Sequence, residues 1–189
     1  MLMVLLNVWL MAAALMALAW YFSMRVKNVG YVDVVWAGLM AAAAILVSYQ
    51  GSGSDIPRVL VALFGGIWGA RLCIHLLKRV LHEAEDGRYQ ALRAAWNGSP
   101  AKFFAFFQMQ ALIVALFSIP FYAAASRHSS EINLWTLAAI AIWLISVFGE
   151  YLADEQLAKF RADAGNKGKT CRSGLWAYSR HPNYFGDAT

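Results

Sequence analysis

The residues best suited to chemistry stand in one run near the end of the chain, Arg180-His181-Pro182-Asn183-Tyr184. These five residues supply a guanidinium group, an imidazole, a rigid proline, an amide and a phenol. Arginine forms bidentate hydrogen bonds with phosphate and carboxylate groups, and a tyrosine ring offers a flat face with a polar tip. Apolar packing does not require this combination. The run therefore predicts a binding site for an anionic, planar ligand.

A second set of polar residues recurs along one predicted helix. Arg71, His75 and Arg79 follow one another at intervals of four, with His82 close in angle. Residues four apart share a helix face, and three donors on one face suit a phosphate or a carboxylate. For Arg79 and His82 the alternative is that their side chains merely reach the membrane surface. Arg71 lies deeper, where an ionisable group is a functional candidate by default.

Several carboxylates complete the set of polar candidates. Glu150 and Asp154 are four residues apart, so they can accept hydrogen bonds from an amide, a ribose or a substrate, or pair with the basic stripe; both alternatives remain open. Asp33 opens an apolar segment and predicts an N-terminal helix cap. The Glu85-Asp86 pair predicts an ordinary solvated helix end. The spacing of His82, Glu83 and Glu85 matches no standard pattern of metal ligands, so we expect no metal site.

The composition predicts that these residues are positioned by a membrane-embedded helix bundle. Hydrophobic residues make up 60% of the chain and charged residues 14%, with a mean hydropathy of +0.50. Five apolar segments have about the 20 residues needed to cross a bilayer. They are Leu2–Phe22, Tyr31–Tyr49, Val59–Leu81, Phe103–Ala125 and Ile132–Leu152. We expect an all-α, polytopic transmembrane bundle that forms a single domain over residues 1–189, with a truncated sixth span that begins near Tyr184.

The basic residues predict the orientation of the bundle. Thirteen of the 16 lysines and arginines lie at the ends of the first, third and fifth segments or in the stretches that follow them, whereas Arg58 and Arg127 lie in the other connections. The positive-inside rule then puts the N-terminus outside and the polar clusters on the cytoplasmic side. Because topology accounts for the net charge of +5, we expect no nucleic acid partner. The predicted location is the bacterial inner membrane, with the functional face cytoplasmic.

Several motifs together resemble the DUF1295 family of bacterial membrane proteins, within the wider group of steroid 5-alpha-reductase-like and sterol-reductase-like enzymes. The likeness covers most of the chain. It rests on Val32-Asp33-Val34-Val35-Trp36, Trp68-Gly69-Ala70-Arg71-Leu72 with His75-Leu76, Glu85-Asp86-Gly87-Arg88-Tyr89, Gln110, Glu150 with Asp154, Gln156-Leu157 and Phe160, Gly174-Leu175-Trp176, and Arg180 to Asp187. The last motif also has a related form in isoprenylcysteine carboxyl methyltransferases, which use S-adenosylmethionine.

The resemblance implies a membrane oxidoreductase that passes a hydride from NADPH to an activated carbon–carbon double bond of a steroid-like or other lipid. It implies that Glu150 and Asp154 lie near the nicotinamide, and that Asn183 and Asp187 contact the cofactor. The other residues that it implies for cofactor binding are Arg71, Tyr178, Arg180, His181 and Tyr184. The alternatives are a membrane methyltransferase that uses S-adenosylmethionine, or an inactive truncated fragment.

The chain departs from the family pattern in two places. Steroid reductases carry a tyrosine that donates to the substrate carbonyl where this chain has Leu76 or Leu72. Asp33, His75 and Tyr89 are the candidate substitutes for this acid, and the sequence does not choose among them. The relatives also continue for roughly two more spans, so we expect a protein that lacks this last part.

Overall fold

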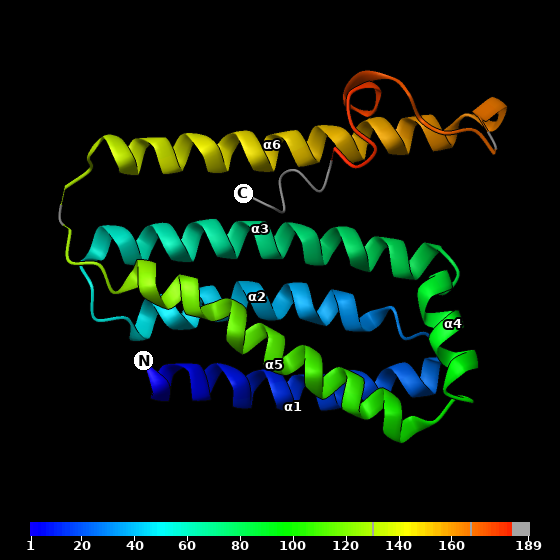
Figure 1. The fold of residues 1–189 in the computed structure, drawn as a ribbon, viewed down its shortest axis with the longest axis horizontal. Helices are drawn as coiled ribbons and strands as arrows, with labels where there is room; N and C mark the ends of the chain where they lie inside the picture. Colours follow the sequence, from blue (N-terminus) through cyan, green and yellow to red (C-terminus); the bar gives the residue numbers. More distant parts are fainter. Residues whose placement is uncertain (130, 167, 183–189) are drawn as a thin grey trace. The chain divides into compact units, whose positions relative to one another are not determined.

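The computed structural model describes residues 1–129, 131–166 and 168–182 (Figure 1). Six α-helices and two short 3-10 helices account for its regular structure in this part of the chain. Five of them are long and apolar enough to cross a membrane: α1 (Leu2–Val26), α2 (Tyr31–Gln50), α3 (Asp55–His82), α5 (Pro100–Ala125) and α6 (Leu134–Ala162). The predicted all-α, membrane-spanning fold class is therefore confirmed.

The helices extend beyond the predicted apolar segments at their polar ends. The helix α3 begins at Asp55 rather than Val59, and α6 continues to Ala162 rather than ending at Leu152. Glutamate, lysine and arginine are good helix formers, and an ion pair of 3.0 Å between Lys159 and Glu155 supports the last turns of α6. Hydropathy locates the part of a helix that crosses the bilayer, but it does not locate the helix end.

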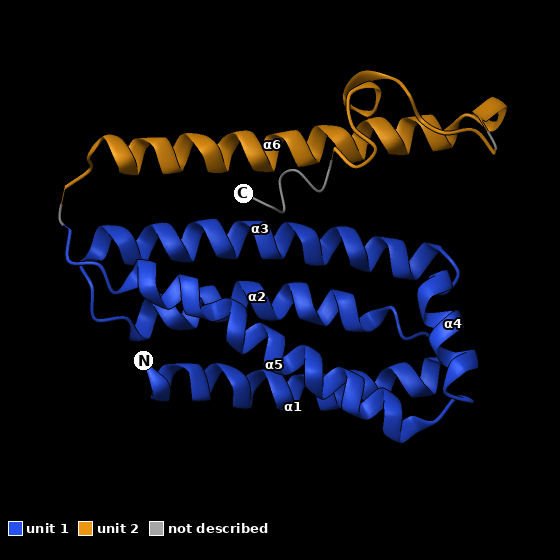
Figure 2. Cartoon of the chain, in the orientation of Figure 1, with its two compact units in different colours: residues 1–130 blue, residues 131–189 orange. Residues whose placement is uncertain are grey.

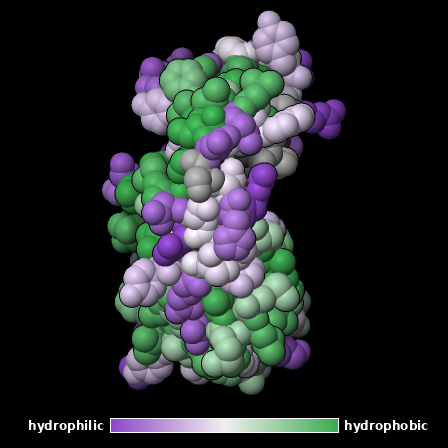
Figure 3. Space-filling view, turned by 90° about the vertical axis from the view of Figure 1, so that its left-hand side faces the viewer, coloured by the Kyte–Doolittle hydropathy of each residue, from purple (hydrophilic) through white to green (hydrophobic). Residues whose placement is uncertain are grey.

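The chain divides into two compact units, residues 1–130 and 131–189 (Figure 2). Unit 1 contains α1 to α5, with the short helix α4 (Gly87–Ala95) across one end (Figure 1). We call this the α4 end: here α1 and α3 end, and α2 and α5 begin. At the opposite end, hydrophilic residues lie among apolar ones on the surface (Figure 3).

The central element of unit 1 is α2, which packs against α1, α3 and α5. Its alanines let α3 approach closely at Gly65 and Gly69, two small residues four apart on α3. A Cβ atom at Gly69 would lie 2.9 Å from the Ala37 carbonyl oxygen and 2.8 Å from the Ala41 nitrogen, and one at Gly65 would collide with Ala44. The glycine pair therefore marks a tight contact between α2 and α3.

Aromatic packing holds α4 against the rest of unit 1. Tyr89 belongs to the buried core, and Trp96 packs edge-on against Phe103 with ring centroids 5.1 Å apart.

The turn between α1 and α2 is fixed by Lys27, which adopts a left-handed φ of 55°, and by Asn28, whose side-chain oxygen accepts the Gly30 N–H at 2.9 Å. These contacts fix α4 and the α1–α2 turn at the same end of unit 1.

Unit 2 consists of α6 and the segment that follows it, residues 163–166 and 168–182. We call this the return segment, because it folds back onto α6. The 3-10 helix η2 (Gly174–Ala177) docks on α6 through two hydrogen bonds. The Leu175 N–H donates to the Gln156 side-chain oxygen at 2.8 Å, and the Trp176 indole N–H donates to the Ala153 carbonyl at 2.9 Å. Gly174 has a φ of +60°, and Gln156 occupies the space that a Cβ atom there would need.

Candidate functional site

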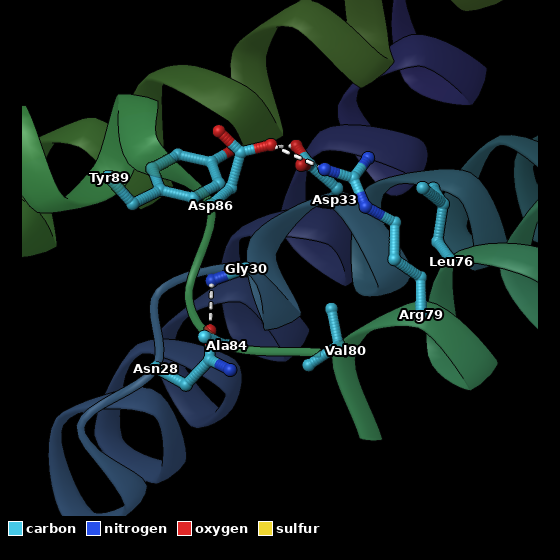
Figure 4. A pocket seen from close by; sticks show the side chains of 9 residues that line it. All are labelled: Asn28, Gly30, Asp33, Leu76, Arg79, Val80, Ala84, Asp86 and Tyr89. Carbon is cyan, nitrogen blue, oxygen red and sulfur yellow. Dashed lines mark hydrogen bonds and ion pairs between the residues drawn. The ribbon is translucent and has the colours of Figure 1, made fainter. Parts of the chain in front are cut away.

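A small polar cavity lies at the α4 end of unit 1 (Figure 4). The α1–α2 turn, the start of α2, the last turns of α3 and the α3–α4 connection all contribute to it. Its volume of about 20 Å³ has room for about one water molecule. The lining residues are Asn28, Gly30, Asp33, Leu76, Arg79, Val80, Ala84, Asp86 and Tyr89.

Asp33 and Tyr89 form the central pair of this cavity. The Tyr89 hydroxyl donates to Asp33 Oδ1 at 2.7 Å, and Arg88 Nη2 approaches Oδ2 at 3.5 Å. The prediction that Asp33 caps α2 is wrong, because the N-cap residue is Gly30 and Asp33 lies inside the first turn. Its carboxylate instead faces α4. Tyr89 is only 5% exposed, and burial together with the neighbouring Asp33 carboxylate raises the pKa of its phenol.

Asp86 joins α3 to α4 and closes the other side of the cavity. It caps α4 by accepting the Arg88 N–H at 2.9 Å. Its second oxygen receives Arg79 Nη2 at 2.6 Å (Figure 4), and Arg88 Nε lies 3.2 Å from the first. The hydrogen bonds from the Arg88 backbone and side chain lower the pKa of Asp86 to about 2. Arg79 therefore forms an ion pair with Asp86. The sequence alone did not decide between ligand binding and a position at the membrane surface for this side chain.

Glu85 is a structural anchor rather than the solvated helix end that the sequence predicted. It accepts the Val29 N–H at 2.7 Å and pairs with Arg93 at 2.8 Å. Its side chain is 12% exposed. The prediction is wrong because composition does not reveal that the backbone of the α1–α2 turn needs an acceptor at this point. Glu85 thus ties the α3–α4 connection to the α1–α2 turn and fixes the approach of α4.

Two of the three candidate acids come together in this structure. Asp33 and Tyr89 share the cavity with Leu76, one of the two positions at which steroid reductases carry their tyrosine. His75 lies one turn before Arg79 in α3 and is not among the residues that line the cavity. Of the three candidates for the acid, the geometry therefore favours Tyr89 and Asp33 over His75.

The residues predicted to bind a cofactor are divided between the units. Arg71 lies in α3 of unit 1, and Glu150 and Asp154 lie one turn apart in α6 of unit 2. The return segment brings three others to the surface of unit 2: Tyr178, which is 93% exposed, Arg180 and His181. Asn183, Tyr184 and Asp187 lie outside the described residues, as does the predicted start of a sixth span.

The surface of unit 2 has side chains that fit an anionic, planar group. Tyr178 and Arg180 offer an exposed ring and a cation two residues apart, beyond the point where Gln156 and Trp176 fix the return segment. A ring can stack on a flat heterocycle, and a guanidinium can hold a phosphate. Among the described residues, no three histidine, cysteine, aspartate or glutamate side chains are grouped so that they could hold a metal ion.

Comparison with known families supplies the classification. Residues 19–189 match the model of a family described as a protein of unknown function, DUF1295. The chain belongs to the DUF1295 family. The family resemblance predicted from the motifs is thereby confirmed, whereas the wider relationship to steroid reductases stays a prediction. No curated protein and no solved structure matches the chain.

The motifs that carry the DUF1295 resemblance contact one another in pairs. Asp33 of the Val32–Trp36 motif binds Tyr89 of the Glu85–Tyr89 motif, and Gln156 holds Leu175 of the Gly174–Trp176 motif. Sequence reasoning missed the roles of Gln156 and Arg93 as anchors. For Arg93 the available signal was its charge, eight residues after the opposite charge of Glu85. Glu85 lies just before the first turn of α4 and Arg93 lies in its last turn, so the short helix keeps the two within reach of each other.

Proposed function

We propose that this DUF1295 protein is a membrane-embedded oxidoreductase that uses NADPH to reduce a carbon–carbon double bond of a steroid-like or other lipid substrate. The observation that carries the proposal is the Tyr89–Asp33 hydrogen bond beside Leu76. The tyrosine that steroid reductases carry on this helix is absent from α3, but the phenol of Tyr89 in α4 reaches the cavity that Leu76 lines. The pair supplies the acid that reduction of an enone requires.

The proposed step divides between the cofactor and these residues. NADPH, when bound, supplies the hydride that adds to the β-carbon of the double bond. The Tyr89 hydroxyl turns from Asp33 to the substrate carbonyl oxygen and stabilises the negative charge that develops there. The Tyr89 phenol then gives the proton that completes the saturated product, solvent restores that proton, and the Asp33 carboxylate orients the phenol. Arg88, at 3.5 Å from Asp33, positions the carboxyl group.

The cofactor is proposed to bind through unit 2. Tyr178 and Arg180 would hold its planar and phosphate groups, and Glu150 with Asp154 would accept hydrogen bonds from its nicotinamide end. The further proposed contacts are Arg71, His181, Asn183, Tyr184 and Asp187.

The excess of basic residues around the α4 end supports a cytoplasmic position for this end in a bacterial inner membrane, with the N-terminus outside.

The test is a cofactor and turnover assay on the full chain in detergent. Binding of NADPH and of S-adenosylmethionine is followed by tryptophan fluorescence, and NADPH oxidation is followed with lipid enones as substrates. We expect binding of NADPH, and turnover that Tyr89→Phe and Asp33→Asn each reduce by about 100-fold or more. Tyr31→Phe, which alters a phenol at the same end that packs on Phe22, is the matched control. Binding of S-adenosylmethionine alone would assign the protein to the methyltransferases instead.

A further inference from the structure

A second, larger hollow opens on the side of unit 1 within the membrane-spanning helices. It has a volume of about 490 Å³, within the range of small-molecule sites. We call it the α1/α2/α3 groove, after the helices that line it. Its residues include Leu18 of α1, Val34, Gly38 and Ala42 of α2, and Cys73 of α3. None of these side chains is charged, so the groove offers only apolar contact and a thiol.

Small residues of α2 create the groove. The helices α1 and α3 both pack on α2, whose Gly38 and Ala42 form part of the floor. A Cβ atom at Gly38 would lie 3.4 Å from the Cys73 sulfur, so a larger side chain there would fill the space between α2 and α3. Leu18 of α1 is 66% exposed although it lines the groove. The groove therefore opens on the surface of unit 1, along helices that are long and apolar enough to cross a membrane.

The groove lies next to the polar cavity along the same two helices. At the start of α2, Gly30 lines the cavity, and Val34, four residues later and on the same helix face, lines the groove. On α3, Leu76 lines the cavity and Cys73 lines the groove. Residues three apart are neighbours on a helix surface, about 4.5 Å apart along its axis. One elongated ligand can therefore contact both hollows.

The size of the groove distinguishes between kinds of occupant. A helix about 10 Å wide fills about 850 Å³ over two turns, which exceeds the 490 Å³ available. A single hydrocarbon chain or a narrow ring system is thinner. The groove is thus too small to enclose a whole helix, but its volume is large enough for the apolar part of a lipid.

We propose that the α1/α2/α3 groove binds the hydrocarbon portion of an amphiphilic membrane lipid, whose polar end points to Asp33 and Tyr89. This inference rests on the proposed function in one respect, namely that the polar end is the end that reacts. It identifies the substrate class as elongated lipids that enter sideways from the bilayer, with the reactive group at the headgroup level.

The experiment uses Cys73 as a reporter inside the groove. The chain has two cysteines, so Cys171→Ser leaves Cys73 as the single thiol of the full chain. The rate of its alkylation by N-phenylmaleimide is measured in detergent, with oleic acid or cholesterol added as the probe and with no cofactor present. We expect at least one probe to slow the alkylation several-fold.

Paired glycine substitutions separate a local effect from a general one. In the Cys171→Ser background, Gly38→Leu fills the groove, so the probe no longer changes the alkylation rate. Gly66→Leu, on a face of α3 where the nearest atoms belong to Ile45 at 3.8 Å, keeps the response to the probe. Ala42→Leu is the second groove variant, and thermal unfolding verifies that each variant is folded. An unchanged response in both groove variants would overturn the inference.

Two other outcomes also count against the proposal. No protection by either probe would mean that the groove does not hold hydrocarbon. Rapid Cys73–Cys73 disulfide formation under mild oxidation would assign the face to a second copy of the chain. Because the alkylation needs no cofactor, protection of Cys73 without NADPH binding would leave the groove assignment intact and remove only the proposed reduction.

Discussion

The Tyr89 hydroxyl donates a 2.7 Å hydrogen bond to Asp33, which lies 56 residues earlier in the chain. This contact joins α4, which lies across the α4 end of unit 1, to the first turn of a membrane-spanning helix. Tyr89 and Asp33 are also held by Arg88 and by the core around Phe106, whose ring lies 6.3 Å from that of Tyr89. The pair is therefore part of the structural framework as well as the proposed source of the proton.

Tyr89→Phe is expected to destabilise the folded protein. The substitution keeps the buried ring but removes the donor, which leaves the Asp33 carboxylate with only the longer contact to Arg88. Loss of one hydrogen bond to a partly buried charged group costs about 1–3 kcal/mol. Thermal unfolding in detergent measures the effect. Tyr31→Phe, whose ring packs on Phe22 in the same region, is the control and should unfold close to the parent temperature.

Alkaline pH is expected to unfold the protein through Tyr89. Its raised pKa means that the folded state keeps the phenol proton at a pH where the unfolded chain has lost it. The stability that this provides is fully present below a pH of about 10, the ordinary pKa of tyrosine, and decreases as the pH rises above it. A plot of unfolding temperature against pH should fall less steeply above pH 10 in Tyr89→Phe. Equal slopes in parent and variant would contradict the assignment.

Acid pH is expected to act through Asp86. Hydrogen bonds from Arg88 hold its pKa at about 2, below the ordinary value of 3.8. The folded state is therefore favoured above pH 3.8, and this contribution is lost as the pH falls from there towards 2. In Asp86→Asn the decline in stability over this range should be smaller. Asp55→Asn, which changes a carboxylate with a 96% exposed side chain, provides the control.

Gly69→Ala is expected to loosen the packing of α2 and α3. The new methyl group would lie 2.8 to 2.9 Å from backbone atoms of Ala37 and Ala41, which cannot move without shifting the helix. Overpacking of this kind costs about 1–3 kcal/mol. The matched change Gly66→Ala meets only the flexible end of Ile45 at 3.8 Å. Its unfolding temperature should stay near that of the parent, and an equal loss in both variants would argue against a tight seam.

Gln156→Ala is expected to release the return segment from α6. The variant loses the acceptor of the Leu175 N–H, while the Trp176 bond to Ala153 remains. Limited proteolysis after Arg172 should become faster, because the backbone there is less firmly held. Glu155→Ala removes a neighbouring surface ion pair with Lys159 and should leave the cleavage rate unchanged. Equal cleavage of parent and Gln156→Ala would mean that Trp176 alone secures the segment.

The membrane-spanning helices could be predicted because each carries its own signal. A run of about 20 apolar residues identifies a span without reference to any other part of the chain. The close approach of α2 and α3 was likewise marked by Gly65 and Gly69, since small residues at this spacing favour helix contact. Both predictions depend on residues that are near each other in sequence.

The polar cavity could not be predicted in the same way. Asp33 at the start of a helix and Glu85-Asp86 after another both have ordinary local explanations, as a cap and as a solvated end. Their actual partners are Tyr89, Arg88, Arg79, Val29 and Arg93, and three of these contacts cross between separate segments. No periodic pattern specifies such pairings, because they depend on where the turns bring the helix ends. The motif resemblance identified the residues but not their partners.

The docking of Gly174 on Gln156 has a consequence for the history of the sequence. A side chain at position 174 would collide with the Gln156 side chain and would also strain a backbone with a φ of +60°. Neither residue can therefore change freely while the other stays the same. Among homologues that keep this return segment, we expect the glycine to persist wherever a long side chain occupies position 156. Exceptions should carry compensating changes at both positions, so an alignment of relatives would record this contact as a correlated pair.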